Sequence, residues 1–416
     1  MHIKRRAFAL GAAGLLLASR PRPAAGADII LKFPSWQAEE EGFAQFWKEI
    51  IAAFERTHPG VKVALQQVAM SDFASDMTIR FASGTPPEIT ELNNGTFGSY
   101  ASQGWLEPLD DRLRKDPLPK GWSGLQSYYQ WNGKTLGILV MGYGYMMLYN
   151  ERLLANAGVA VPTSFAEFVA AVPKITAKDK GIYGLASVTA EYPTIYGEML
   201  SYIMWQGADA FRGGHYTFTD PAVVSALETY RSLVGGNASL GTLSTMMRQT
   251  FFSGKAGFML DGPWAYALMN LAPPDLRPSL KMVATPFRPH TGGASNNLHI
   301  PAAIPADRKD LVWEFIKLTT QPEWQRRYFM LTSSAPGLPG ALTAEDLAAA
   351  PVLAEVAKAA QDAVSLVPLL QPIQENVNEF VQILMRSAVR ILTTKDPVVQ
   401  ICQQTQAELA RAVPLG

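Results

Sequence analysis

Side chains able to catalyse a reaction or bind a metal are present in this 416-residue chain, but their spacing matches no catalytic motif. There is no Gly-x-Ser-x-Gly elbow and no His-Glu-x-x-His helix. The five histidines lack the spacing of metal ligands: His2, His58, His215, His290 and His299. Gly133-Lys134-Thr135 resembles the end of a phosphate-binding loop, but Tyr128 stands where the first glycine must be. We therefore expect no metal and no cofactor, while a carboxylate pair in a secreted carbohydrate-active enzyme remains an alternative.

Aromatic and planar polar side chains fit a different chemistry, the recognition of a polyhydroxyl ring. Aromatic faces pack on the apolar faces of such a ring, and amides or carboxylates bond its hydroxyl edges. Trp36 follows a mostly apolar run at residues 29–33, and Asn93, Asn94 and Thr96 follow a second strand at 88–92. Open α/β sheets bind ligands at the carboxyl ends of their strands, so these four residues are candidate ligand contacts. Plain surface packing is the alternative for Trp36.

The elements that must position these residues alternate between strands and helices. After the first strand, apolar residues recur at helical spacing until His58-Pro59-Gly60 ends the helix: Phe43, Phe46, Trp47, Ile50, Ile51 and Phe54. Residues 61–65 then alternate apolar and polar, as in a strand with one solvated face. This β-α-β opening predicts an α/β fold with a parallel sheet and helices on its faces.

Composition excludes some classes of partner. Lys+Arg and Asp+Glu are each 36, so the formal net charge is zero. Nucleic-acid binders and polybasic membrane-surface proteins need a surface of one sign, so neither partner is expected. The chain is 48% hydrophobic and long enough to form two cores.

The N-terminus predicts export. Lys4-Arg5-Arg6 precedes a short apolar run at residues 9–18, and Ala25-Gly26-Ala27 is a small-residue cleavage site, which predicts a signal peptide over 1–27. The arginine pair favours the twin-arginine route, with the Sec route as the rival. The single cysteine, Cys402, excludes an intrachain disulfide, and no cysteine follows the apolar run to carry a lipid anchor. We expect a free periplasmic protein.

Five stretches of the chain resemble one known family. Tyr149-Asn150 is followed by a short helix and by Pro162-Thr163-Ser164-Phe165, where Ser164 and Glu167 form a capping box. The other stretches follow in family order: residues 54–63, 84–109, 251–264 (ending in Gly262-Pro263-Trp264) and 292–323. Together they resemble the extracellular solute-binding proteins (family 1) of ABC sugar importers, of the maltose-binding-protein type.

The resemblance implies a two-lobed periplasmic-binding-protein fold whose chain crosses three times between the lobes. Lobe one would hold residues 28–139 and 290–334, and lobe two residues 142–284 and 340–416. The hinges would lie near 139–142, 284–289 and 334–339, two of which are rich in the Pro and Gly typical of hinges. A monomer that closes on its ligand and docks on a membrane permease is implied as well.

Aromatic site residues come from the same resemblance. Trp264 matches the tryptophan that stacks on the ligand in maltodextrin-binding relatives; a core tryptophan beneath a tight turn is the alternative. Tyr143 lies just past the first predicted crossing, where it either faces the cleft or packs beside Tyr145.

Polar site residues are also carried over. Glu191 and Tyr192 resemble a Glu-x-Tyr region of lobe two, with solvated loop residues as the alternative. Asp261 either accepts ligand hydroxyls or caps the turn before Pro263, and Asn297 either binds ligand or serves a turn. Where maltodextrin-binding relatives carry an acidic and a basic ligand contact, this chain has Gly95-Thr96, which argues against maltodextrin specificity.

The expected function is that of a non-enzymatic periplasmic receptor for an ABC importer. Its ligand would be a neutral sugar, such as a disaccharide or short oligosaccharide. A polyol or glycerol-3-phosphate is the alternative within this class, but a phosphate ester would require Arg or Lys at the cleft. The named loops contain few of either.

Overall fold

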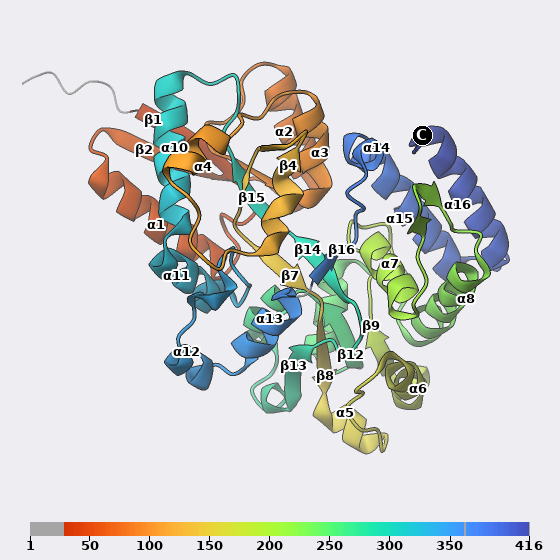
Figure 1. Cartoon of the computed structure of the whole chain (residues 1–416). Helices are drawn as coiled ribbons and strands as arrows, with labels where there is room; N and C mark the ends of the chain where they lie inside the picture. Colours follow the sequence, from red (N-terminus) through yellow and green to blue (C-terminus); the bar gives the residue numbers. More distant parts are fainter. Residues whose placement is uncertain (1–28, 362, 416) are drawn as a thin grey trace, which may run out of the picture.

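The computed structural model describes residues 29–361 and 363–415, apart from the side chain of Asn94. These residues form two α/β lobes with separate hydrophobic cores, as the sequence predicts (Figure 1). The predicted signal peptide lies outside the described residues. In the described part of the chain, we find no helix with the length and apolar character needed to cross a membrane.

Lobe one combines strands from two separate segments of the chain. Its main strands are β1 (Ile29–Ser35), β2 (Val61–Gln67), β3 (Thr90–Asn93), β6 (Ile138–Leu139) and β15 (Asn296–His299). The predicted β-α-β opening is confirmed, because β1 pairs in parallel with β2. β15 pairs antiparallel with both β3 and β6, so the later segment of the chain completes this lobe. A small hairpin joins β4 (Gln130–Trp131) to β5 (Lys134–Thr135).

Helices cover both faces of the lobe-one strands. They are α1 (Phe43–Thr57), α2 (Met70–Ala82), α3 (Asn94–Ser102), α4 (Asp110–Lys115), η1 (Gly124–Tyr129), α10 (Ala306–Thr320) and α11 (Pro322–Thr332). The apolar face predicted for α1 is buried, and its Trp47 packs edge-on against Phe33 of β1 at a ring-centroid distance of 4.9 Å. Such contacts fix the helix on the sheet.

Lobe two has a four-stranded mixed sheet in the order β13-β8-β12-β9. Its strands are β8 (Met146–Asn150), β9 (Tyr183–Ala186), β12 (Ala256–Asp261) and β13 (Leu280–Ala284), with a hairpin of β10 (Phe211–Arg212) and β11 (His215–Tyr216). β12 pairs antiparallel with β8 and parallel with β9. All six residues of β12 are buried, so this strand runs through the centre of the lobe and ends at Asp261.

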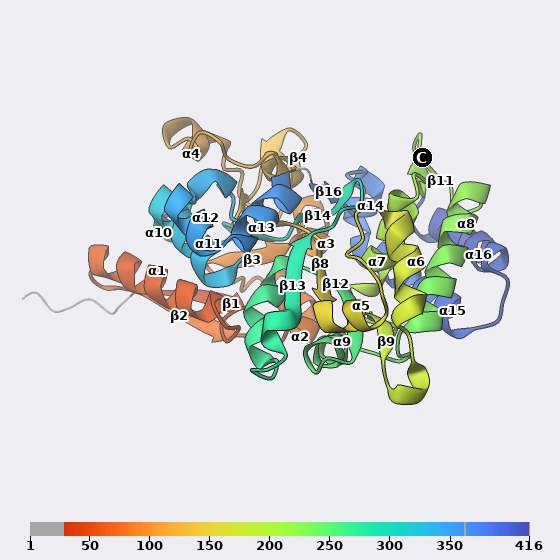
Figure 2. The ribbon, with the colours of Figure 1, turned by 90° about the horizontal axis from the view of Figure 1, so that it is seen from below.

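Helices of lobe two come from the middle and the end of the chain. The middle segment supplies α5 (Glu151–Asn156), α6 (Phe165–Ile175), η2 (Lys178–Lys180), α7 (Ile195–Trp205), α8 (Pro221–Tyr230), η3 (Arg231–Gly235), α9 (Ser244–Phe252), η4 (Pro263–Leu271) and η5 (Arg277–Ser279). The final segment supplies η6 (Pro339–Ala341), α12 (Ala344–Ala349), α13 (Val352–Gln361), α14 (Gln371–Glu375), α15 (Val377–Thr393) and α16 (Val398–Ala412). Seen from below, α1 and β2 lie at one end of the molecule and α8 and α16 at the other (Figure 2).

One of the two hydrogen bonds of the capping box predicted for α6 is present. Ser164 accepts a hydrogen bond from the backbone N–H of Glu167 at 3.2 Å. The Glu167 carboxylate, however, bonds the backbone N–H of Thr163 at 2.7 Å instead of that of Ser164. The cap therefore satisfies two free N–H groups, one of them a residue earlier than in a standard capping box.

A small sheet of close-packed strands lies between the lobes, in the order β16-β14-β7. It contains β7 (Gly142–Gly144), β14 (His290–Ala294) and β16 (Ala363–Ser365). A Cβ on Gly292 would lie 2.1 Å from the carbonyl oxygen of Tyr143, so glycine is required for this approach. Thr291 still contacts lobe two, since Ser201 of α7 donates to its hydroxyl at 2.9 Å, and the lobe-one core resumes at Ala294.

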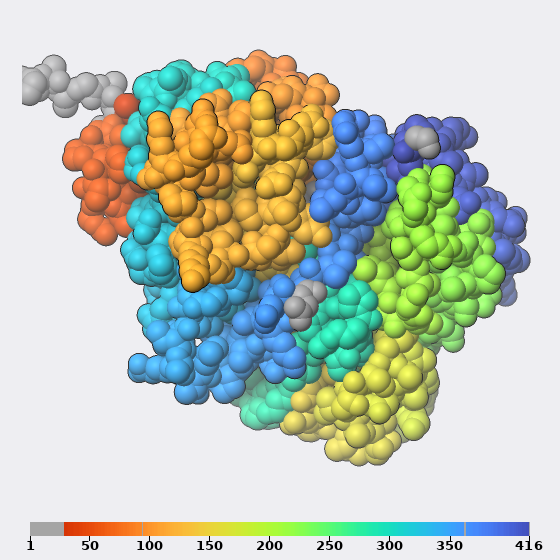
Figure 3. Space-filling view, viewed as in Figure 1, coloured from red at the N-terminus to blue at the C-terminus, as the bar shows by residue number. Residues whose placement is uncertain are grey.

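The lobes also meet outside this sheet. α3 of lobe one packs against α14 and α15 of lobe two, and the segment around α14 fills the space between the lobes (Figure 3). A Cβ on Gly98 of α3 would lie 2.3 Å from the carbonyl oxygen of Gln374 in α14. The two backbones are therefore in direct contact at this point.

Candidate ligand-binding site

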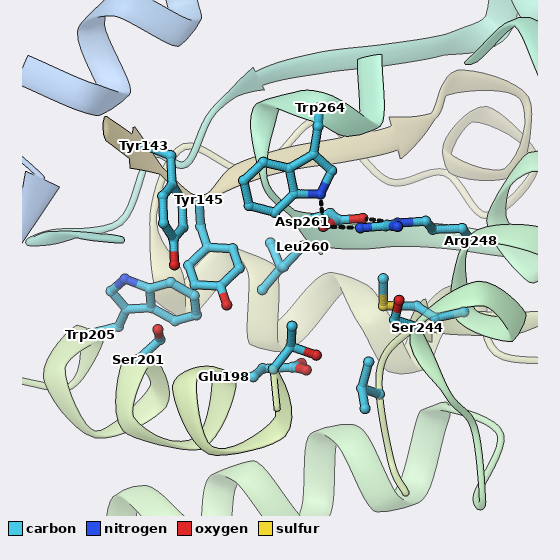
Figure 4. A pocket seen from close by; sticks show the side chains of 13 residues that line it. Tyr143, Tyr145, Glu198, Ser201, Trp205, Ser244, Arg248, Leu260, Asp261 and Trp264 are labelled. Atoms are coloured by element: carbon cyan, nitrogen blue, oxygen red, sulfur yellow. Dashed lines mark hydrogen bonds and ion pairs between the residues drawn. The ribbon is translucent and has the colours of Figure 1, made fainter. Parts of the chain in front are cut away.

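A cavity of about 60 Å³ lies beside the central sheet, where β7 enters lobe two (Figure 4). It is lined by residues of β7, α7, α9, β12 and η4 and of the loops beside them: Tyr143, Tyr145, Val188, Thr194, Glu198, Ser201, Trp205, Ser244, Met247, Arg248, Leu260, Asp261 and Trp264. Its volume holds several water molecules but falls well below the ~300–1,000 Å³ of typical ligand pockets. All of its lining residues fall within residues 143–264, so the cavity belongs to lobe two and to the strand that enters it.

Trp264 forms the roof of the cavity, as Figure 4 shows. Its indole Nε1 donates to Asp261 Oδ1 at 3.1 Å, and its ring lies 5.2 Å from the ring of Tyr143 at an angle of 59°. A Cβ on Gly262 would lie 2.2 Å from the indole, so the glycine lets the ring fold back over the end of β12. Trp264 is half-buried and also packs against the core of lobe one, so it touches both lobes.

Asp261 is the buried last residue of β12 and anchors the polar side of the cavity. Its carboxylate accepts from Arg248 Nε at 2.7 Å and Nη2 at 3.2 Å, and from the backbone N–H of Gly262 at 2.8 Å. Burial lowers the pKa of Arg248, but Asp261 outweighs that effect and the guanidinium pKa is raised. The two residues form a buried ion pair with matched charges, so the pair brings no net charge to the cavity.

Tyr143 and Tyr145 line the side of the cavity nearest the central sheet. Their rings meet edge-on at a centroid distance of 5.9 Å. Burial raises the pKa of both phenols above their ordinary value, so both are neutral over the physiological range. They offer the cavity hydroxyl groups and aromatic surface.

Glu198 and Trp205 lie on α7, opposite Trp264. Both oxygens of the Glu198 carboxyl lie 2.8 Å from the hydroxyl of Ser187, and burial raises the carboxyl pKa to about 8. The Trp205 indole donates to the carbonyl oxygen of Pro289 at 3.1 Å, which ties α7 to the second crossing. Sequence reasoning missed both residues. The available signal was a lone acidic residue in helix 195–205, whose other residues are apolar or aromatic apart from Ser201.

The structure brings three of the ten sequence-predicted site residues into this cavity: Tyr143, Asp261 and Trp264. Arg248 is a further lining residue that the sequence reading missed, because α9 has a weakly amphipathic pattern that does not reveal which face is inward. Its position opposite Asp261 depends on the packing of α9 beside β12, which only the fold establishes.

Two predicted lobe-one contacts lie away from the cavity. Trp36 is 7% exposed and packs edge-on against Phe73 of α2 at 4.7 Å, as part of the lobe-one core. Asn297 is fully buried in β15, donates to the Leu92 carbonyl oxygen at 2.9 Å and bonds His299 through its own oxygen. Both side chains are engaged in packing or strand pairing within lobe one.

The residues around the start of α3 and in the 191–192 loop also do not line the cavity. Asn93 is half-buried and accepts from the hydroxyl of Thr96, which also donates to the Asn93 carbonyl oxygen at 3.2 Å. Asn94 is the first residue of α3, and its side chain is outside the described atoms. Glu191 is exposed, whereas Tyr192 is half-buried against lobe two and acts electrostatically on Arg248.

A metal centre is not indicated. Within residues 29–361 and 363–415, no group of three or more His, Cys, Asp or Glu side chains is placed to hold a metal ion. The cavity instead combines aromatic rings, hydroxyl groups and one neutralised ion pair. This set of groups suits a ligand bound by hydrogen bonds and ring stacking.

Comparison with known proteins assigns the class. The profile of the family described as bacterial extracellular solute-binding protein matches residues 37–326, more than two-thirds of the chain. The chain therefore belongs to the bacterial extracellular solute-binding protein family, and its members are binding proteins found outside the cytoplasm.

Individual relatives are distant. A maltotriose-binding protein of Pyrococcus abyssi is 21% identical over 342 residues, covering 79% of this chain and 71% of the relative. The putative ABC transporter periplasmic-binding protein YcjN of Escherichia coli is 24% identical over 244 residues, covering 55% of this chain and 54% of the relative.

Solved structures share the fold closely. The GacH receptor of Streptomyces glaucescens, known with and without acarbose, has a TM-score of 0.79 at 21% identity, covering 93% of this chain and 98% of that one. UgpB from Mycobacterium tuberculosis, solved with glycerophosphocholine, has a TM-score of 0.78 at 18% identity, covering 92% and 98%. At these identities, the likeness establishes the two-lobed fold.

Proposed function

We propose that this protein is the substrate-binding protein of an ABC importer and binds a neutral sugar, a disaccharide or short oligosaccharide, between its lobes. The observation that carries the proposal is the roof of the cavity, where Trp264 presents a ring fixed by Asp261 and touches both lobes. A ring held in this way stacks on a sugar face and couples ligand binding to lobe closure. Relatives that bind maltotriose and acarbose support a saccharide ligand.

Charge distinguishes a neutral sugar from a phosphate ester. Arg248 is the only cationic side chain lining the cavity among the described residues, and Asp261 binds it through two N–H groups. A phosphate would have to compete with this buried carboxylate for the same guanidinium. Polyols and glycerophosphodiesters, which related structures hold, remain the alternative ligands of the same fold.

Delivery of the ligand requires the lobes to separate and close. The cavity described above is too small for a disaccharide, so we expect the lobes to stand further apart when the ligand is bound than they do in this structure. We place the hinge movement near residues 139–142, 284–289 and 334–339, where the chain passes between the two cores. The closed monomer would then dock on permease subunits in the inner membrane, with no nucleic-acid partner.

Export belongs to the same proposal. Residues 1–27 would act as a twin-arginine-like signal peptide, cleaved near Ala27 to release the protein into the periplasm. Changing Arg5 and Arg6 to lysine should leave precursor in the cytoplasm if the twin-arginine route is used. Undiminished export of that variant would instead assign the Sec route.

Catalysis is not part of the proposed function. The cavity contains two carboxyl groups, but those of a glycosidase must be free to act as acid, base or nucleophile. Both oxygens of Asp261 are engaged by Arg248, Gly262 and Trp264. A sugar that binds should therefore be recovered unchanged, and chromatographic detection of turnover would contradict the receptor assignment.

A thermal-shift screen tests the proposal directly. A ligand that binds only the native state raises the melting temperature with its concentration. The panel should contain maltose, maltotriose, melibiose, raffinose, ribitol, glycerol-3-phosphate, glycerophosphocholine and spermidine. We expect neutral sugars to give the largest shift; a shift confined to the phosphate-bearing compounds would overturn the sugar assignment.

A further inference from the structure

Glu198 occupies the inner wall of the cavity, on the lobe-two side (Figure 4). It is 8% exposed and lies in α7, opposite the roof formed by Trp264. A carboxyl group in such a place is unusual, because burial of an acid requires a partner or the loss of its charge.

The partners of Glu198 do not meet the needs of a charged carboxylate. One hydroxyl, that of Ser187, lies 2.8 Å from both carboxyl oxygens and can donate its single hydrogen to only one of them. The same hydroxyl is also 3.3 Å from the Val188 carbonyl oxygen. At least one oxygen of Glu198 is therefore left with hydrogen-bonding capacity beside the cavity.

The groups around Glu198 also favour its neutral form. Burial raises its pKa to about 8, the Ser187 hydroxyl acts in the opposite direction, and Asp261 raises it further. The neighbouring phenols Tyr145, Tyr202 and Tyr230 bring no positive charge: burial raises the pKa of each, and the Glu198 carboxylate raises it further. Arg248 is committed to Asp261, so no free cation faces Glu198 within the described cavity.

We propose that Glu198 is a specificity-determining residue, which bonds a hydroxyl group at the buried end of the ligand and excludes an anionic group there. The inference rests on the proposed function and specifies which end of the ligand is chemically restricted. A carboxylic acid donates one hydrogen bond and accepts another, which matches a sugar hydroxyl. A carboxylate or phosphate at this end would lie beside Asp261 and Glu198 without a counter-ion.

The chemistry predicts a characteristic pH profile. A bound ligand displaces water from the cavity, so ionising Glu198 is harder in the complex than in the free protein. Above the pKa of the free protein, binding then requires uptake of one proton. The dissociation constant should be constant up to pH ~7.5 and rise about tenfold per pH unit beyond pH ~8.

The experiment measures dissociation constants by titration calorimetry from pH 6 to pH 9.5, with the neutral sugar that gives the largest thermal shift as the probe. Glu198→Gln keeps the shape, one donor and one acceptor, and cannot ionise. We expect it to bind within about threefold of the native protein at pH 7 and to lose the alkaline decline. Glu198→Leu removes the hydrogen bonds and should weaken binding about tenfold at pH 7.

Glu91 supplies a matched control. It is also a fully buried glutamate whose pKa burial raises to about 8, but it lies in β3 of lobe one and bonds Asn296. Glu91→Gln should therefore leave the pH profile of ligand binding unchanged. Melting temperatures of all variants, measured without ligand, separate a loss of folding from a loss of binding.

Several outcomes would overturn the inference. A profile of the native protein without alkaline decline would do so, as would the same decline in Glu198→Gln. An affinity that rises with pH, or a glucosamine-type ligand that binds far better than its neutral counterpart through Glu198, would make the residue a charged counter-ion instead. If no sugar in the panel binds, the proposed function itself fails, and the inference fails with it.

Discussion

The indole Nε1 of Trp264 donates to Asp261 Oδ1 over 3.1 Å, so the ring over the cavity is held by the same carboxylate that pairs with Arg248. One aspartate thus orients an aromatic ring and neutralises a guanidinium. Because Asp261 ends the fully buried strand β12, the position of the ring is determined by the core of lobe two. The orientation of Trp264 is fixed before a ligand arrives, which lowers the entropy lost on binding.

Removing the ring of Trp264 should weaken ligand binding more than stability. Loss of a well-placed aromatic anchor costs ~2 kcal/mol or more of binding, about thirtyfold in dissociation constant. Trp264 is only half-buried, and Asp261 keeps its bonds to Arg248 and Gly262 without it. We expect Trp264→Ala to show this loss in titration calorimetry with a small fall in melting temperature, and Trp264→Phe to recover part of the affinity.

Trp36→Ala is the matched control for Trp264→Ala. Trp36 packs in the lobe-one core, so its removal should lower the free energy of unfolding by ~3–5 kcal/mol and leave the affinity of the folded protein near its native value. Normal ligand binding by Trp264→Ala together with a large loss of stability would make Trp264 a structural residue and contradict its placement in the site.

Breaking the ion pair should change the charge preference of the cavity. Asp261→Asn removes the carboxylate that pairs with Arg248, whose side chain is 24% exposed, and leaves only the more distant charge of Glu40 to act on it. Removal of one partner from a buried pair destabilises by ~3–5 kcal/mol, and partial exposure of the guanidinium favours the lower end. We expect a lower denaturation midpoint, weaker sugar binding and a new thermal shift with glycerol-3-phosphate.

One outcome of the Asp261→Asn experiment would contradict this prediction. If Asp261→Asn gains no affinity for the phosphate ester, Arg248 does not face the bound ligand and the charge argument for a neutral sugar fails. Glu191→Gln is a suitable control, because Glu191 is an exposed acidic residue of the same lobe that does not line the cavity. It should leave both stability and ligand preference unchanged.

Local patterns were sufficient to predict much of the fold. Helical spacing from Phe43 to Phe54 identified the buried face of α1, and the β-α-β order predicted the parallel pairing of β1 with β2. These features depend on neighbours in the sequence, so periodicity reveals them. The antiparallel pairing of β15 with β3 joins residues about 200 positions apart. The resemblance to a two-lobed family indicated that residues 290–334 return to lobe one, but the pairing itself was not predicted.

Fewer residues of the site than of the fold could be predicted from the sequence, again because some of them depend on long-range packing. Tyr143, Asp261 and Trp264 were found because family motifs mark them, but Glu198 and Arg248 lie on helices whose inward face depends on tertiary packing. Trp36 shows the converse situation: it follows a strand end, yet its ring packs against Phe73 of α2. The end of a strand shows where the edge of the sheet lies, but it does not show whether a helix covers that edge.

Buried glutamates should make the protein less stable as pH rises through neutrality. The pKa of Glu91 and that of Glu198 are about 8 in the folded protein because of burial, against 4.5 as the ordinary value. Between about pH 6.5 and 7.5 both carboxyls are protonated when folded and ionised when unfolded, so these two groups release two protons on unfolding. Glu40, whose pKa burial raises to about 7, adds part of a third proton at the lower end of this window. Glu91 and Glu198 together should lower the free energy of unfolding by about 2.7 kcal/mol per pH unit, twice the ~1.36 kcal/mol of a single proton, and their contribution should level off above pH 8.

Chemical denaturation at a series of pH values checks this slope. Glu91→Gln and Glu198→Gln should each reduce it by about 1.4 kcal/mol per pH unit, since each removes one proton from the balance. The window stays above pH 6.5 because burial lowers the pKa of His299 from 6.5 to about 4, so that protonation of this histidine in the unfolded state lowers stability as pH falls below 6.5. A slope unchanged in both variants would show that these carboxyls are ionised in the folded state.

Contact between α3 and α14 should control how far the lobes close. Gly98 lets the α3 backbone approach Gln374 so closely that an added Cβ would lie 2.3 Å from its carbonyl oxygen and 2.6 Å from its carbonyl carbon. Neither backbone atom can rotate aside, so even Gly98→Ala must push the lobe-one helix away from lobe two. The closed form would become less populated, and the apparent affinity for ligand would fall in proportion to that population. We expect a loss of about three- to tenfold in affinity, a shift of ~0.7–1.4 kcal/mol in binding free energy, and a larger radius of gyration in small-angle scattering with saturating sugar.

Gly124→Ala is the control for Gly98→Ala, since a Cβ there meets open space in the same lobe. If Gly98→Ala binds and compacts like the native protein while Gly124→Ala is also silent, then α3 and α14 separate and rejoin without limiting closure.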